Sequence, residues 1–308
     1  MVVRPRALKA GDRLAVVAPA SAFDRGEFAA GIHELRTLGF DPVYDDSVFA
    51  RQRYLAGSPE VRAAALRAAW TDPSIAGLVS VRGGYGSAQL LPLLDRELVR
   101  QAAKVLVGYS DITTLLAFHT LFCGIVSFHG PMLAGRFGRG QSGYDRDSFM
   151  RAVTEPVPLG QLAPEGLEVV RPGETIGPLL GGTLTQLLAS LGTPFAFTPP
   201  EGYVLLIDEV GERPYRLDRM ITQARQAGLL AKARAIVIGE LPNCDEPSGD
   251  PTGRAVMADL LADFPGPVVI GFPTGHTTGP TMTLPLGVAC RVIADGRPRI
   301  VIEDAAVS

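Results

Sequence analysis

The fold is decided by residues 104–113, which read Lys-Val-Leu-Val-Gly-Tyr-Ser-Asp-Ile-Thr. A short apolar run rich in β-branched residues opens this stretch and predicts a buried strand that ends at Gly108. Apolar residues at helical spacing follow, with Asp111 in the first turn. A strand, a tight turn carrying Ser110 and then a helix form a nucleophile elbow, although Ile112 replaces the second glycine of the usual G-x-S-x-G. A serine that only caps the helix is the structural alternative.

Strands and helices alternate around this stretch. Strands are expected near 12–21, 40–45, 75–81 and 104–108, and helices near 28–38, 61–70 and 90–98. Ser58 is a good N-cap for the second of these helices. Such alternation over about 120 residues predicts an α/β fold with a doubly wound parallel sheet.

The pattern weakens between residues 137 and 177, where four prolines interrupt the chain after a Gly-rich loop. This stretch predicts a domain boundary. We expect an N-terminal domain over 1–160, a linker over 161–173 and a C-terminal domain over 174–308.

Composition narrows the class of protein. The chain has 308 residues, 46% of them hydrophobic, and a net charge of −3 with a pI near 5.9, which argues against nucleic acid or an anionic membrane as partner. No apolar run is long enough to span a bilayer, and the N-terminus shows no secretory signal. The three cysteines are far apart and predict reduced thiols in a cytoplasmic protein, without a zinc site.

Three polar clusters follow apolar strands, where open α/β sheets place their ligands. The first is 82–86, Arg-Gly-Gly-Tyr-Gly, whose glycines let backbone N–H groups approach a substrate closely. The second, 208–212, contains three carboxylates, and the third is a loop that carries His276. A serine needs a neighbouring base, so the order serine, acid, histidine favours acyl transfer by Ser110.

Each cluster also has a structural reading. The glycines could form a plain turn, and the acids a solvated turn that caps the next helix. Among the other histidines, His33 and His119 are expected within helices, whereas His129 lies on a loop and is a rival for the base.

Motifs along nearly the whole chain resemble the LD-carboxypeptidases of peptidase family S66, which also include the microcin C immunity peptidases. The resemblance rests on Val17-Ala-Pro-Ala-Ser21, Tyr54-Leu-Ala-Gly57, Val81-Arg-Gly-Gly-Tyr-Gly86, Gly108-Tyr-Ser-Asp111, Phe128-His-Gly-Pro-Met132, Gly181-Gly-Thr-Leu184, Gly192-Thr-Pro194, Glu212-Arg-Pro-Tyr-Arg-Leu-Asp-Arg219, Gly275-His276 and Leu284-Pro-Leu-Gly287.

This resemblance implies a flavodoxin-like domain followed by a smaller α/β domain with its own sheet. It also implies a cytoplasmic serine carboxypeptidase, without metal or cofactor, that releases terminal D-Ala from murein tetrapeptides during cell-wall recycling. The nucleophile falls at Ser110 and the base at His276. The oxyanion donors would be the N–H of Asp111 and that of Gly83 or Gly84. Members of the family tend to dimerise, but nothing in this sequence shows an interface, so the resemblance leaves a homodimer open.

One position departs from the family, which has Glu where this chain has Asp208. We expect Asp208 to orient the histidine, with Glu209 as the alternative, although neighbours on a strand point to opposite faces. The cation for the substrate's terminal carboxylate would be Arg82, Arg213 or Arg216. Two rival functions are a same-fold peptidase acting on peptidyl-nucleotides and a non-catalytic protein that binds a small ligand.

Overall fold

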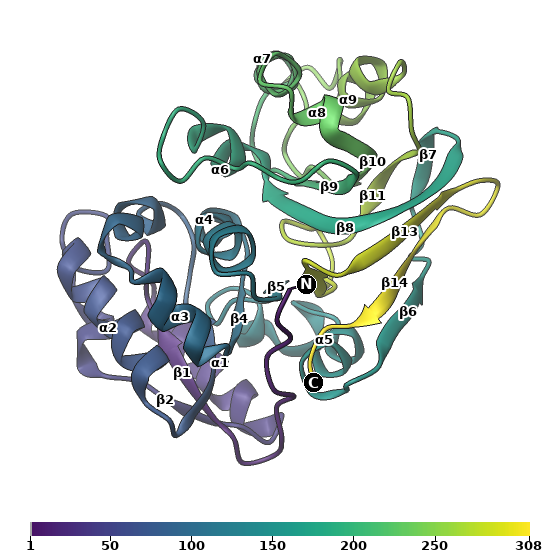
Figure 1. The fold of residues 1–308 in the computed structure, drawn as a ribbon. Coiled ribbons are helices and arrows are strands. Elements are labelled where there is room, and N and C mark those ends of the chain that lie inside the picture. The colour runs from purple at the N-terminus through teal and green to yellow at the C-terminus, as the bar shows by residue number, and fades with distance from the viewer. Residues whose placement is uncertain (1) are drawn as a thin grey trace.

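Two β-sheets with helices packed on them make up the protein, in a computed structural model that describes residues 2–308 (Figure 1). The first sheet has the strand order β12-β5-β4-β3-β1-β2. Its strands are β1 (Arg13–Val17), β2 (Asp41–Val43), β3 (Ile75–Ser80), β4 (Val105–Gly108), β5 (Ser127–His129) and β12 (Leu284–Leu286), and the helices of this half are α1 (Arg25–Thr37), α2 (Pro59–Thr71), α3 (Arg96–Ala102), α4 (Thr113–Ala117) and α5 (Arg146–Thr154).

The first sheet confirms the predicted flavodoxin-like topology. Strands β2, β1, β3, β4 and β5 lie side by side in that order and pair in parallel. Helix α2 begins where the sequence indicated, because the Ser58 side chain accepts a hydrogen bond from the Val61 amide at 3.4 Å. The loops after β1 and β3 meet at the point where the strand order reverses, which is where such sheets bind ligands.

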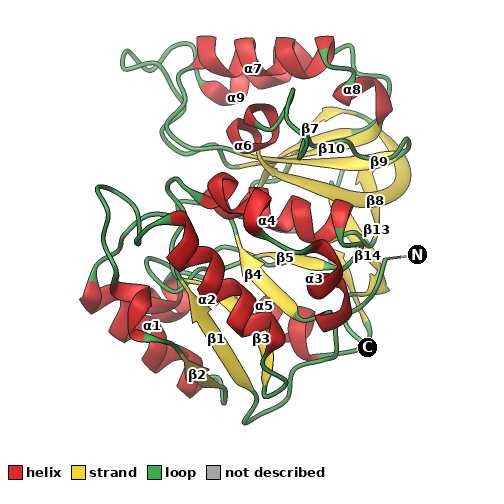
Figure 2. Ribbon diagram, turned by 60° about the vertical axis from the view of Figure 1, so that its left-hand side comes forward, coloured by secondary structure: helices red, strands yellow, loops and turns green. Residues whose placement is uncertain are grey.

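The second sheet has the order β6-β14-β13-β8-β9-β10-β11-β7. Its strands are β6 (Pro158–Leu162), β7 (Glu168–Arg171), β8 (Gly173–Thr183), β9 (Tyr203–Asp208), β10 (Ala233–Gly239), β11 (Val268–Phe272), β13 (Ala289–Ala294) and β14 (Arg299–Ala305), and its helices are α6 (Leu184–Ala189), α7 (Pro214–Gln226), α8 (Leu229–Lys232) and α9 (Gly253–Leu261). Figure 2 shows α7, α8 and α9 on the side of this sheet that faces away from the first domain.

The segment 161–173 differs from the linker that we expected. It holds the end of β6, which pairs with β14, and all of β7, which pairs with β11. The C-terminal region also returns to the first sheet, because β12 pairs antiparallel with β5. The two halves of the molecule are therefore joined by strand pairing as well as by side-chain contacts.

The central strands of the second sheet, β9, β10 and β11, are buried on both faces. In β9, Val204 and Leu206 belong to the hydrophobic cluster shared with the first domain, whereas Leu205 and Ile207 pack into the cluster beneath α6 to α9. This alternation continues past the end of the strand and decides which way the acidic residues there point. No helix within residues 2–308 has the length and apolar character needed to cross a membrane.

Candidate active site

Ser110 lies on a strained turn at the end of β4. Its φ angle is 62°, in the left-handed region that non-glycine residues rarely adopt. Ser110–Ile112 form one 3-10 turn that leads into α4, and Ser110 stays partly exposed while Tyr109 and Asp111 are buried. A Cβ added to Gly108 would lie 2.6 Å from the Ile112 side chain, so Ile112 fills the space beside that glycine. The strand, turn and helix thus form an elbow without the second glycine.

The glycine loop after β3 passes directly beside this serine. A Cβ on Gly83 would lie 2.8 Å from the Ser110 Cβ and 3.1 Å from the Asp111 amide nitrogen. Within residues 2–308 no backbone carbonyl accepts a hydrogen bond from the amide of Gly83 or of Gly84. The backbone of Gly83 therefore lies next to Ser110 and the Asp111 amide, and its own amide is available as a donor.

Hydrogen bonds between Asp111 and Ser87 link the glycine loop to the elbow. The Asp111 carboxylate is buried and accepts a hydrogen bond from the Ser87 amide at 2.8 Å, while the Ser87 hydroxyl donates to the Asp111 carbonyl at 2.5 Å. Burial raises the pKa of Asp111 against the lowering effect of these hydrogen bonds. The sequence indicated a role for the Asp111 backbone only, and Ser87 carried no signal of its own.

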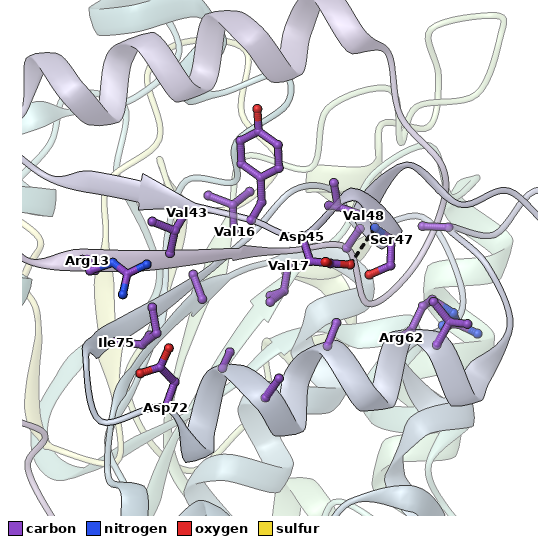
Figure 3. Close-up of a pocket in the computed structure, with 18 residues that line it drawn as sticks. Arg13, Val16, Val17, Val43, Asp45, Ser47, Val48, Arg62, Asp72 and Ile75 are labelled. Atoms are coloured by element: carbon purple, nitrogen blue, oxygen red, sulfur yellow. Dashed lines mark hydrogen bonds between the residues drawn. The ribbon is translucent and has the colours of Figure 1, made fainter.

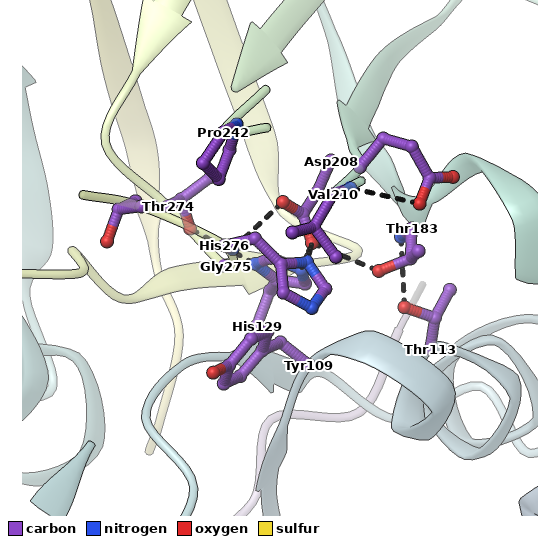
Figure 4. A network of polar contacts seen from close by, with 12 residues as sticks. Tyr109, Thr113, His129, Thr183, Asp208, Val210, Pro242, Thr274, Gly275 and His276 are labelled. Carbon is purple, nitrogen blue, oxygen red and sulfur yellow. Dashed lines mark hydrogen bonds and ion pairs between the residues drawn. The ribbon is translucent and has the colours of Figure 1, made fainter. Parts of the chain in front are cut away.

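Asp208, the buried last residue of β9, pairs with His276, which lies on the loop after β11 and is partly exposed (Figure 4). His276 Nδ1 lies 2.8 Å from Asp208 Oδ2, and the His276 backbone amide donates to Oδ1 at 2.9 Å. The Thr183 hydroxyl donates to the same Oδ2 at 3.0 Å. Because Nδ1 donates to the carboxylate, Nε2 of the neutral ring keeps a free lone pair and can accept a proton.

Burial alone would raise the pKa of Asp208, but the adjacent His276, with its charge and its hydrogen bond, outweighs that effect and holds the pKa below its ordinary value. Asp208 therefore carries a negative charge opposite the ring, which stabilises an imidazolium there.

The Glu209 side chain points to the face of the sheet opposite to that of Asp208. Its Oε2 accepts hydrogen bonds from the Thr185 amide and hydroxyl at 2.9 and 2.7 Å, on the side of the sheet that carries α6. Burial raises its pKa. The strand alternation places Asp208 on the face of Val204 and Leu206, toward the elbow, so Asp208 and not Glu209 contacts the histidine.

Two contacts hold the elbow around Ser110 against the Asp208–His276 pair. The Tyr109 ring packs edge-on against the His276 ring, with centroids 5.0 Å apart. On the other side of Ser110, the Thr113 hydroxyl accepts a hydrogen bond from the Thr183 amide at 3.0 Å. Ser110 thus lies between two residues that are fixed to the acid and the histidine. Tyr109, Thr113 and Thr183 lie within stretches that the sequence singled out, but none of the three had a predicted role of its own.

His129 lies beside the pair but is sealed from solvent. Its Nε2 is 3.8 Å from Asp208 Oδ2, and its Nδ1 is 3.1 Å from the Thr274 hydroxyl. Burial lowers its pKa to about 4, so the ring is neutral at physiological pH. The His276 side chain is 16% exposed and His129 is fully buried, so of the two only His276 can reach a substrate. His33 is exposed on α1, and His119 is buried in the π-helical turn Phe118–Phe122 that continues α4.

The three candidate arginines differ in their partners. Arg213 is paired with Glu246, and Arg216 lies 3.3 Å from a Glu212 oxygen. Arg82 is exposed and donates only to the Ala22 carbonyl, at 2.9 Å. Of the three, Arg82 alone has no carboxylate partner within residues 2–308.

A separate cavity of about 280 Å³ lies between α2 and strands β1 and β2 (Figure 3). Its lining is mostly alanine and valine, with charged groups such as Arg62 and Asp72, and contains none of the candidate catalytic residues. No cluster of three or more potential metal ligands occurs within residues 2–308.

Comparison with known proteins places the chain among peptidases. Residues 14–130 match the LD-carboxypeptidase N-terminal domain, and residues 176–292 match the LD-carboxypeptidase C-terminal domain. A putative carboxypeptidase of Streptomyces coelicolor, SCO6489, is 38% identical over 96% of this chain and 94% of its own. The murein tetrapeptide carboxypeptidase of Pseudomonas aeruginosa is 32% identical over 86% of this chain and 88% of its own.

Comparison with solved structures also matches the chain to this group of peptidases. Muramoyltetrapeptide carboxypeptidase from Oxalobacter formigenes superposes with a TM-score of 0.83 at 28% identity, covering 95% of this chain and 99% of its own. The microcin C7 self-immunity protein MccF in complex with aspartyl sulfamoyl adenosine has the same fold, with a TM-score of 0.89 at 23% identity over 99% and 100% of the two chains. Both halves of the chain match along most of their length, and the chain belongs to the LD-carboxypeptidase family.

Proposed function

We propose that this protein is a serine LD-carboxypeptidase that releases terminal D-Ala from murein tetrapeptides. The proposal rests on the Asp208–His276 pair, which packs against Tyr109, the residue before Ser110. Ser110 itself is held at a φ of 62° next to Gly83, whose amide donates to no backbone carbonyl in the described chain. This combination provides a nucleophile, a base with an orienting acid and donors for an oxyanion. The murein relatives supply the substrate class.

In the proposed mechanism, His276 Nε2 takes the proton from Ser110 Oγ, which attacks the carbonyl carbon of the bond before the terminal residue. The oxyanion accepts hydrogen bonds from the amide of Asp111 and from that of Gly83 or Gly84. His276 then donates its proton to the amine of the departing D-amino acid. Water, deprotonated by His276, hydrolyses the acyl-enzyme and regenerates the free serine.

Arg82 would bind the terminal carboxylate of the substrate. Its guanidinium is exposed, has no carboxylate partner in the described chain and belongs to the loop that carries the donor amides. A cation at this position would favour cleavage at the last bond only, because only that residue carries a free carboxylate.

We propose a cytoplasmic location, where murein peptides are recycled, and the three buried, unpaired cysteines fit a reducing compartment.

The test is incubation with murein tri-, tetra- and pentapeptides, with mass detection of the products. Release of D-Ala from the tetrapeptide alone supports the proposal. The main alternative is a peptidase acting on peptidyl-nucleotides, and it is favoured by the fold shared with MccF. Residues 183–186, Thr-Leu-Thr-Gln, carry no aromatic side chain that could stack on a base, and for that reason we favour murein. Cleavage of an aspartyl-adenylate analogue, with no D-Ala release from any peptide, would reverse this preference.

A further inference from the structure

Arg136, in the segment after β5, is a buried cation without a counter-ion. It is 7% exposed, and no carboxylate lies within ion-pair distance of it in the part of the chain that the structure describes. Removing a guanidinium from water is costly unless its N–H groups find good acceptors. Arg136 therefore needs several hydrogen-bond acceptors close to its guanidinium.

Four of the five polar partners of the guanidinium lie around the candidate active site. It donates to the carbonyls of Gly275 at 2.9 Å, Thr277 at 3.2 Å and Gly279 at 3.1 Å, which flank His276 on both sides. It also donates to the Tyr109 hydroxyl at 3.2 Å. A further bond, to the Gly143 carbonyl at 3.3 Å, ties it to its own loop.

These contacts join two parts of the site that come from different domains. Tyr109 immediately precedes Ser110, and its ring also packs on the His276 ring. The loop over 275–279 belongs to the second sheet, whereas Tyr109 belongs to the first. One side chain thus contacts the backbone around the base and the residue next to the nucleophile.

We propose that Arg136 is a positioning residue that sets the distance and angle between His276 and Ser110. It holds the loop around His276 against the elbow. Its planar guanidinium donates to four carbonyls and one hydroxyl, which is more acceptors than the three N–H donors of a lysine can serve. This inference rests on the proposed function, because it assigns a role within the same catalytic pair.

The charge of Arg136 has a separate effect from its geometry. The groups that face His276 are Asp208, His129, Tyr109 and Arg136, and Glu240 binds the nearby Thr278 amide and hydroxyl at 2.8 Å. Among them Arg136 is the fixed positive charge, and it disfavours an imidazolium at His276. Removal of this charge should therefore move the acid limb of the pH profile of kcat/KM to higher pH.

The test compares Arg136→Lys, which keeps the charge, with Arg136→Gln, which removes it. Because a displacement of about 1 Å in a catalytic group costs about 100-fold, we expect kcat to fall by about that factor in both variants. We expect the acid limb to stay in place in Arg136→Lys and to shift upward in Arg136→Gln. Lys104→Met is the matched control, because Lys104 is also buried and donates to carbonyls, of Ala69 and Asp72, outside the site. That control should lose thermal stability but keep kcat per folded molecule.

The rate at which a fluorophosphonate labels Ser110 gives a second readout that does not depend on the natural substrate. Slower labelling in both Arg136 variants than in Lys104→Met supports the inference. Equal labelling rates in all folded variants would overturn it and leave the proposed function standing. A wild-type protein that is neither labelled nor releases D-Ala would overturn the proposed function instead.

Discussion

Replacement of Asp208 by Asn tests the proposed roles of Asp208 and His276. In the structure, Asp208 Oδ1 accepts the His276 backbone amide at 2.9 Å, and Oδ2 accepts the ring Nδ1–H at 2.8 Å. An asparagine can keep only one of these acceptors. If its carbonyl stays on the backbone amide, its NH₂ group faces Nδ1, which must then accept a hydrogen bond. The ring proton moves to Nε2, and the ring can no longer take the proton of Ser110.

We expect Asp208→Asn to lower kcat by about 10⁴-fold, or about 5 kcal/mol of transition-state stabilisation, because the ring is held in the wrong tautomer. The assay is D-Ala release from murein tetrapeptide, with the amount of folded protein checked by circular dichroism. Glu209→Gln is the matched control, since that carboxylate faces Thr185 on the other side of the sheet. It should keep kcat within about threefold of wild type. A Glu209→Gln variant that is inactive beside an active Asp208→Asn would refute this reasoning.

Three further substitutions test other parts of the account. Gly83→Ala places a methyl group 2.8 Å from the Ser110 Cβ, so kcat per folded molecule should fall about 100-fold in steady-state assays. Unchanged kcat would mean that the loop lies farther from Ser110. Arg82→Gln should raise KM by about tenfold and leave kcat nearly unchanged if Arg82 binds the substrate carboxylate in the ground state, and a fall in kcat alone would exclude that role. Burial lowers the pKa of His119 to about 4, below its unfolded value, so folding stability is lost as pH falls from about 6.5 toward 4. Urea unfolding of His119→Leu should show a weaker loss over this range, and an unchanged pH dependence would contradict the shift.

The sequence was most informative where chemistry is local. The elbow at 104–113 and the glycine loop at 82–86 each follow an apolar strand pattern, so both could be located from the chain alone. A helix cap and a plain turn were their structural alternatives, and only the two stretches together with the distant acid and histidine pointed to catalysis. Strand alternation also predicted that Asp208 and Glu209 point to opposite faces. It did not indicate which face meets the histidine, because that depends on how the second sheet packs against the first domain.

Contacts between distant segments could not be predicted in the same way. The stretch 161–173 resembles a linker because β6 and β7 are short edge strands with proline and glycine nearby, and their partners β14 and β11 lie about 100 or more residues later. Arg136 also lacks a local signal, since its role depends on carbonyls of residues 275–279. Any residue can supply a backbone carbonyl, so the sequence gives no sign of where such acceptors lie.

The most direct test of the central claim is the combined measurement of binding and D-Ala release for wild type and Ser110→Ala with murein tetrapeptide. The account predicts that the wild type releases D-Ala, and that Ser110→Ala binds the tetrapeptide with similar affinity in calorimetry but releases none above the uncatalysed rate. Release by Ser110→Ala at a rate comparable to that of the wild type would contradict the assignment of Ser110 as nucleophile.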